Sequence, residues 1–130
     1  MPKQNKPLLI LIAGPYLSGT HGDAAKIAEN HARLESYALP IYARGHLPIV
    51  SEWMALPIIQ DAGGQTHGDA IFTQYQYPVA QRLLRRCDAL LRIPGASRGA
   101  DNDVTYAQSL GLPIYYRVDQ IPLYIEENPT

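Results

Sequence analysis

The chain has 130 residues, of which 46% are hydrophobic, enough for one sizeable core but short for two domains. Its net charge of −1 excludes the basic field that holds nucleic-acid polymers, and a single cysteine, Cys87, excludes an intrachain disulfide framework and a cysteine-based zinc site. No apolar run approaches the roughly 20 residues of a membrane span, and the residues after Met1 do not show the charged-then-apolar pattern with a small-residue cleavage site that is typical of a leader. We therefore expect one cytoplasmic domain over residues 1–130, with no membrane or nucleic-acid partner.

Strand and helix patterns alternate in the first half of the chain. The apolar run 8–13 is typical of a strand covered on both faces, as in a parallel sheet. A helix is expected from residue 24, kinked or ended by Pro40, and a second strand at 47–50. The buried face of that helix would carry Ile27, His31, Leu34 and Leu39. Residues 51–72, which contain the Gly63-Gly64 pair, are predicted to be a loop or lid excursion.

The alternation continues in the second half. A helix is expected over 73–86, with Arg82, Arg85 and Arg86 on its solvated face, followed by a strand at 89–93 that leaves Cys87 in the core. A helix over 100–110 would stop at Gly111, and strands are expected at 113–117 and 121–125. This order predicts an α/β fold with a doubly wound, mostly parallel sheet of about five strands, in the order 2-1-3-4-5.

Residues 95–99 spell G-x-S-x-G between a strand and a helix, the context of a hydrolase nucleophile elbow. In such hydrolases the catalytic histidine follows the serine, but all four histidines of this chain precede Ser97. The pattern therefore disfavours a serine hydrolase. No G-x-G-x-x-G or Walker A loop occurs, and no histidine spacing supports a metal site. We expect neither a metal nor a cofactor.

In the predicted sheet the first and third strands are neighbours, so the loops that follow them meet at one edge. The side chains expected there are Tyr16, Ser18, Thr20, Ser97, Arg98, Asp101 and Asp103. Backbone N–H groups at Gly14, Gly19 and Gly99 could cradle an anion there, and Arg98 could pair with a phosphate. Ser97 is equally suited to capping the helix, and Asp101 to capping and the helix dipole.

Three segments of the chain resemble the nucleoside 2-deoxyribosyltransferase superfamily: AGPYLSG, GHLPIV and CDALLRIPGASRGADNDVTYAQSLGLPI. The resemblance implies a flavodoxin-like fold and a carboxylate nucleophile, at Asp103, that attacks the sugar C1′. It also implies that Ser97 and Gly99 bind a 5′-phosphate and that the hydroxyl of Tyr16 orients the carboxylate. It further implies a homo-oligomer, a dimer or a tetramer.

Two positions depart from the family pattern. Glutamate is usual where this chain has Asp103, and no acid lies between Asp69 and Asp88, in the helix where the family carries a second one. We expect the second site acid to come from Asp61, Asp69 or a neighbouring subunit. Aromatic residues could stack on a base or lie in partly buried positions; these are Trp53, Tyr75 and Tyr77.

The sequence thus predicts a protein that cleaves or transfers the N-glycosidic bond of a (deoxy)nucleoside or its 5′-monophosphate. The first alternative is a non-catalytic nucleotide-binding module that uses the same crevice. The second is a flavin-binding protein, against which a colourless preparation would argue.

Overall fold

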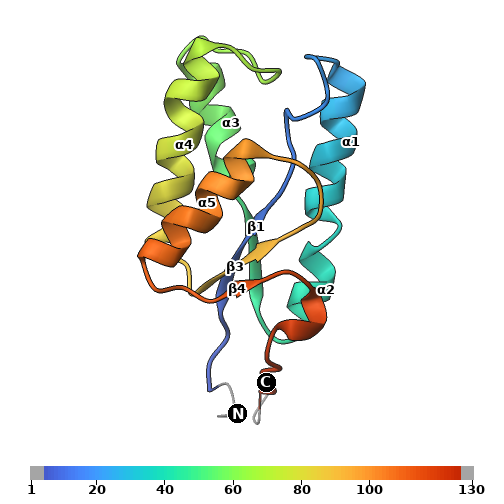
Figure 1. The fold of residues 1–130 in the computed structure, drawn as a ribbon, viewed down its shortest axis with the longest axis vertical. Coiled ribbons are helices and arrows are strands. Elements are labelled where there is room, and N and C mark those ends of the chain that lie inside the picture. The colour runs from blue at the N-terminus through green and yellow to red at the C-terminus, as the bar shows by residue number, and fades with distance from the viewer. Residues whose placement is uncertain (1–4, 127–130) are drawn as a thin grey trace.

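A computed structural model describes residues 5–126 as an α/β fold in which a parallel sheet lies between two groups of helices (Figure 1). The four strands, in the order β2-β1-β3-β4, are β1 Leu9–Ala13, β2 Leu47–Val50, β3 Ala89–Arg92 and β4 Ile114–Tyr115. The predicted doubly wound α/β class and the order of these strands are confirmed.

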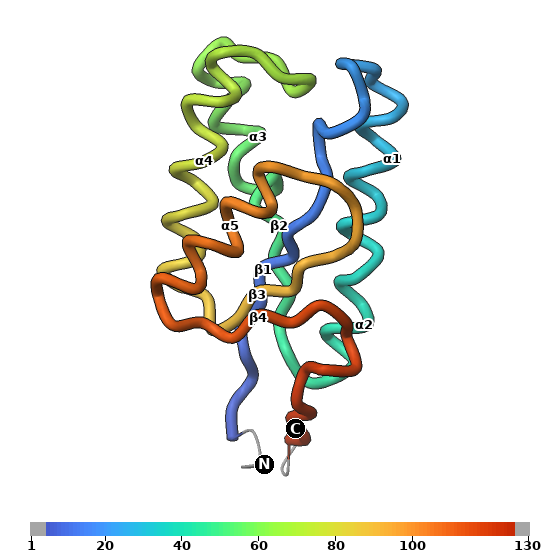
Figure 2. Tube along the Cα trace, in the orientation of Figure 1, coloured from blue at the N-terminus to red at the C-terminus, as the bar shows by residue number. Residues whose placement is uncertain are grey.

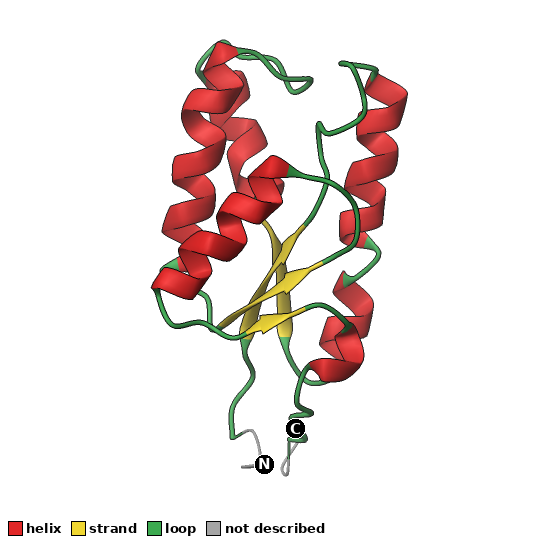
Figure 3. Cartoon of the chain, viewed as in Figure 1, coloured by secondary structure: helices red, strands yellow, loops and turns green. Residues whose placement is uncertain are grey.

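Both faces of the sheet are covered by helices, as Figure 3 shows. On one face Ile10 of β1 lies in a cluster that contains Ile27 of the first helix, and on the other face Leu11 lies in a cluster with Leu84 and Ala107. Alternate side chains of β1 therefore enter two different cores, which is why the strand is apolar throughout.

The first predicted helix is divided in two: α1 Ala24–Glu35 and α2 Ala38–Ala43. The Asp23 side chain caps α1 by accepting from the Ala25 N–H at 2.9 Å. A continuous helix would bring the Pro40 ring against the Ser36 carbonyl four residues earlier, and α1 ends before that residue. The break turns Leu39 outward, where it is 73% exposed, so its predicted burial is wrong.

The prediction of a loop or lid over residues 51–72 is wrong for much of that segment. Residues Glu52–Asp61 form helix α3, and α4 begins at Ala70 and runs to Leu84, so only the connection 62–69 is irregular. Pro57 lies inside α3 and the Gly63-Gly64 pair follows it, which together obscured the helical pattern. Ala55 and Ile59 of α3 are fully buried and hold it against the core.

After β3 the chain forms α5 Arg98–Ser109, β4 and a short 3-10 turn, η1 Val118–Gln120. The predicted fifth strand at 121–125 does not form. Pro122 has no N–H to give to a ladder, and the carbonyls of Ile121 and Pro122 are already taken by Arg44 and His46. Figure 2 shows this last segment passing beside α2.

His46 links this last segment to the start of β1. Its Nδ1 accepts from the Leu8 N–H at 2.9 Å, and its Nε2 donates to the Pro122 carbonyl at 2.6 Å. The ring is 1% exposed, so the two bonds together satisfy a buried imidazole and fix its tautomer.

Two structural roles expected from the sequence are confirmed. Cys87 is buried, and the three arginines near the end of α4 are exposed. Among residues 5–126, no helix is both long enough and apolar enough to cross a membrane.

Candidate functional site

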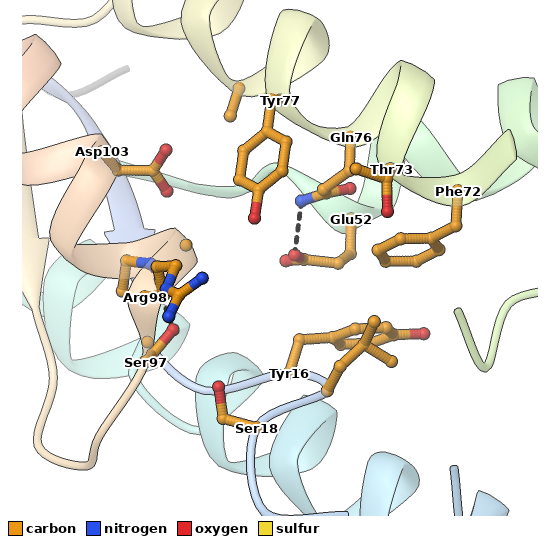
Figure 4. A pocket seen from close by; sticks show the side chains of 15 residues that line it. Tyr16, Ser18, Glu52, Phe72, Thr73, Gln76, Tyr77, Ser97, Arg98 and Asp103 are labelled. Carbon is orange, nitrogen blue, oxygen red and sulfur yellow. Dashed lines mark hydrogen bonds between the residues drawn. The ribbon is translucent and has the colours of Figure 1, made fainter. Parts of the chain in front are cut away.

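A pocket of about 180 Å³ opens where the carboxyl ends of β1 and β3 meet (Figure 4). Its walls are the loop after β1, the first turns of α5, the beginning of α3 and one face of α4. Most of the predicted site residues line it: Gly14, Tyr16, Ser18, Ser97, Arg98, Gly99 and Asp103. The pocket therefore lies at the edge where the loops after these two neighbouring strands meet.

Three residues predicted at this crevice have other roles in the structure. Gly19 lies at an exposed turn with a φ of 74°, which favours glycine. Thr20 is buried and donates to the Leu17 carbonyl at 2.6 Å. Asp101 is exposed and pairs with Arg92 at 2.9 Å. None of these three residues is among those that line the pocket, and Asp101 lies in the first turn of α5, the position of its alternative role at the helix dipole.

The N-terminus of α5 provides the polar end of the pocket. Ser97 caps the helix, its Oγ accepting from the Ala100 N–H at 3.1 Å. The first N–H groups of a helix have no intrahelical acceptor and carry the positive end of its dipole. A Cβ on Gly99 would meet only the Tyr77 ring, at 3.8 Å, so the backbone here is open to a ligand. Arg98 adds a positive charge beside it, and the arrangement suits an anion.

Asp103 lies farther along α5, and its carboxyl group faces the same space (Figure 4). Burial raises its pKa to about 7, and the negative charge of Glu52 adds to the increase, while the positive charge of Arg92 opposes it. A carboxyl group with this pKa exchanges its proton near neutral pH, as acid and base catalysts do.

Glu52 is the second acid of the pocket, and it is not among the site residues expected from the sequence. It begins α3, is buried, and accepts a 2.7 Å hydrogen bond from Gln76 Nε2. Burial raises its pKa to about 7, against smaller lowering effects from its backbone and from Gln76 and Ser51.

The acids predicted for this second role are elsewhere. Asp61 is exposed at the end of α3, and Asp69 caps α4 by accepting from the Phe72 N–H at 2.7 Å. A signal for Glu52 was present in the sequence, because it follows β2 by two residues and the carboxyl ends of parallel strands share one edge.

Tyr16 lines the pocket with its ring, but its hydroxyl points away from Asp103 (Figure 4). The hydroxyl donates to the Thr66 carbonyl at 3.2 Å, and the ring stacks on Phe72 with centroids 5.8 Å apart. Burial raises the pKa of Tyr16 to about 12, with a further contribution from Glu52. The expectation that this hydroxyl orients Asp103 is therefore not met by the structure.

Helix α4 forms the wall opposite Ser97 and Arg98. Thr73, Gln76 and Tyr77 line the pocket from this helix, so of the three aromatic residues considered for base stacking only Tyr77 lies there. Tyr75 packs against the core, and the Trp53 indole donates to Glu35 at 2.7 Å.

Within the part of the chain that the structure describes, no three His, Cys, Asp or Glu side chains are grouped so as to hold a metal ion. The pocket instead combines two carboxyl groups, the N-terminus of α5 and aromatic walls. In comparisons with known proteins, no family model and no curated protein matches the chain.

Proposed function

We propose that the protein cleaves or transfers the N-glycosidic bond of a (deoxy)nucleoside or nucleoside 5′-monophosphate. The observation that carries the proposal is the shared pocket of Asp103 and Glu52, with the N-terminus of α5 beside it. Cleavage of a glycosidic bond by the retaining route uses one carboxylate as nucleophile and one carboxylic acid to protonate the leaving group. Both groups are present, and both have pKa values near neutral pH.

In the proposed reaction the Asp103 carboxylate attacks C1′ of the sugar. The bond from C1′ to the base nitrogen breaks, its electron pair stays with the base, and Glu52 donates a proton to the base. A sugar ester of Asp103 results. Water then attacks C1′ and gives its proton to the Glu52 carboxylate, and the Asp103 carboxylate leaves. A second base in place of water would give transfer.

The polar end of the pocket supports a phosphate-bearing substrate. A 5′-phosphate at the N-terminus of α5 would accept from backbone N–H groups near Gly99 and pair with Arg98. The sugar would then lie between this terminus and the two acids, and the base against Tyr77 and the ring of Tyr16.

The proposal also includes the fold family, the cellular location and the assembly that were expected from the sequence. We regard the fold as a flavodoxin-like one that lacks a fifth strand in the described part, within the nucleoside 2-deoxyribosyltransferase superfamily. The expected setting is the cytoplasm, and the expected assembly is a homo-oligomer without a cofactor.

The test is base release, followed by chromatography, from ribonucleosides, deoxyribonucleosides and their 5′-monophosphates. The wild-type protein should release a base from at least one of them, and Asp103→Asn should lower that rate by at least about 10³-fold. Glu52→Gln should lower it most for bases that leave poorly without protonation.

Thermal stabilisation by each compound gives the control for binding. If one compound stabilises the protein and none is cleaved, the catalytic proposal is contradicted for that panel and the protein is a nucleotide-binding module. If Asp103→Asn retains the wild-type rate, the nucleophile has been assigned to the wrong residue.

A further inference from the structure

Tyr77 reaches across the pocket from α4 toward the first turn of α5. The Cε1 atom of its ring lies 3.8 Å from the position that a Cβ on Gly99 would take, which is an ordinary contact distance. The side chain lines the pocket, and its hydroxyl points into the space between Asp103 and Glu52 (Figure 4). The hydroxyl therefore faces the volume that a ligand would occupy.

The turn of α4 that carries Tyr77 is fixed against α3. The preceding residue, Gln76, donates from Nε2 to Ser51 Oγ at 3.1 Å and to Glu52 Oε2 at 2.7 Å. A tyrosine side chain has only two torsions to order, so it makes a contact at a low cost in conformational entropy. A hydroxyl carried on this anchored turn is therefore well prepared to bind a ligand.

The hydroxyl of Tyr77 is available to a ligand, whereas that of Tyr16 is not. Tyr16 donates to the Thr66 carbonyl at 3.2 Å, away from the two acids. Among the side chains of the described residues that line the pocket, Figure 4 draws one hydrogen bond, from Gln76 to Glu52. Tyr77 is thus not paired with another of these side chains, and a phenol hydroxyl can both donate and accept.

The two ends of the pocket determine which part of a nucleotide this hydroxyl would meet. A phosphate is expected at the N-terminus of α5 beside Arg98, and the glycosidic bond beside Asp103 and Glu52. In a nucleoside 5′-monophosphate the sugar joins these two parts, so it would lie in the space toward which the Tyr77 hydroxyl points. The hydroxyl groups of that sugar are its hydrogen-bond donors.

We propose that Tyr77 is a specificity-determining residue that forms a hydrogen bond with a ring hydroxyl of the substrate's sugar. The inference rests on the proposed function for the placement of the phosphate and the sugar, but it is measured by binding, without turnover. Recognition of a nucleotide then depends on the hydroxyls of its sugar as well as on its base.

The test removes a hydroxyl from the protein and from the ligand in turn. Calorimetric titrations use adenosine and cytidine 5′-monophosphates with their 2′-deoxy and 2′,3′-dideoxy counterparts, so each series loses one hydroxyl at each step. For the wild-type protein, one of the two steps should lower the affinity by about threefold to tenfold. For Tyr77→Phe, the same step should change the affinity by less than about twofold, because the protein partner is already gone.

Tyr75→Phe is the matched control. It removes a hydroxyl from the same helix, and Tyr75 packs against the core instead of lining the pocket. This variant should discriminate between the nucleotides as the wild-type protein does. Melting curves verify that both variants are folded. An equal loss of discrimination in Tyr75→Phe would assign the effect to a general change in α4 and would overturn the inference.

Equal discrimination by Tyr77→Phe and the wild-type protein at both steps would also overturn the inference, even where base release is observed. The expected loss of discrimination in a protein that releases no base would support the sugar contact while contradicting the reaction. If none of the six nucleotides binds, the sugar contact is contradicted, and the base-release assay on nucleosides decides the reaction separately.

Discussion

Gln76 donates to Glu52 through Nε2 at 2.7 Å, and this orientation leaves Oε1 of the same amide buried without a hydrogen-bond donor. The orientation suits an ionised Glu52, which can only accept. Turning the amide by 180° would bring Oε1 to the carboxyl group, where a protonated Glu52 could donate to it. Gln76 can thus form a hydrogen bond with Glu52 in either charge state. An acid that releases and regains a proton during a reaction needs such a partner.

The buried acids should make the protein less stable as the pH rises. The pKa of Glu52 is raised from 4.5 to about 7, so the folded state binds its proton more tightly than the unfolded state does. This contribution is fully present below about pH 4.5 and is lost as the pH rises through 7. We expect the melting temperature to fall between pH 5 and pH 8, and Glu52→Gln to be more stable at pH 8 by on the order of 2 kcal/mol.

The exposed Glu29 of α1 gives the matched control for this change. Glu29→Gln should retain the wild-type slope of stability against pH, whereas Glu52→Gln should flatten it. Urea titrations at pH 5 and pH 8 measure both, and an unaltered slope in Glu52→Gln would contradict the buried-acid description.

Gly99→Ala should separate binding from folding. The added Cβ meets nothing closer than the Tyr77 ring at 3.8 Å, and alanine favours a helix over glycine by up to about 1 kcal/mol. The variant should therefore be as stable as the wild type or more so, but bind 5′-monophosphates more weakly, because its methyl group occupies the anion end of the pocket. Calorimetric titration with a monophosphate tests the expected loss of binding, and a melting curve tests the expected stability.

Gly14→Ala provides the opposite case. A Cβ at Gly14 would overlap the Ile93 side chain, so this change should destabilise the fold by about 1–3 kcal/mol. Equal stability in the two alanine variants would show that the close approach of Gly14 to Ile93 is not required.

Ser97→Ala should affect both stability and substrate preference. Losing the cap of α5 costs about 1 kcal/mol, and losing a hydroxyl beside the anion should lower the preference for monophosphates over nucleosides by about tenfold. Asp23→Ala removes the corresponding cap of α1 away from the pocket, so it should reduce stability similarly with no change in preference. Chemical denaturation and KM ratios distinguish these outcomes.

Tyr16→Phe should retain the proposed activity within a few-fold. The hydroxyl bonds to the Thr66 carbonyl, so its removal should cost about 1 kcal/mol of stability and leave the ring stacked on Phe72. A loss of base release of about 10²-fold would instead place the hydroxyl in the chemistry.

The sequence predicted the parts of the site that depend on strand order. The order of the apolar strands determines which loops become neighbours, and for this reason Ser97, Arg98 and Asp103 were expected near Ser18. All four line the pocket. The N-terminus of α5 could be predicted from the local sequence, because serine is a preferred N-cap residue and Ser97 directly precedes the helix.

What the sequence did not reveal depends on tertiary contacts. Residues 52–61 contain a proline and an almost continuous apolar pattern, and their helix is fixed by burial of Ala55 and Ile59, which no local preference predicts. Glu52 was missed with that helix. The direction of the Tyr16 hydroxyl depends on Thr66, fifty residues away.

The hydrogen bonds of His46 affect which segments of the chain can unfold locally. Its two hydrogen bonds join the Leu8 amide to the Pro122 carbonyl, so the segment after the last strand cannot detach without leaving a buried ring nitrogen unpaired beside β1. We therefore expect residues 121–124 to open together with the central strand, although they belong to no strand themselves. The hydrogen-exchange rate of the Leu8 amide reports directly on whether that far segment is in place.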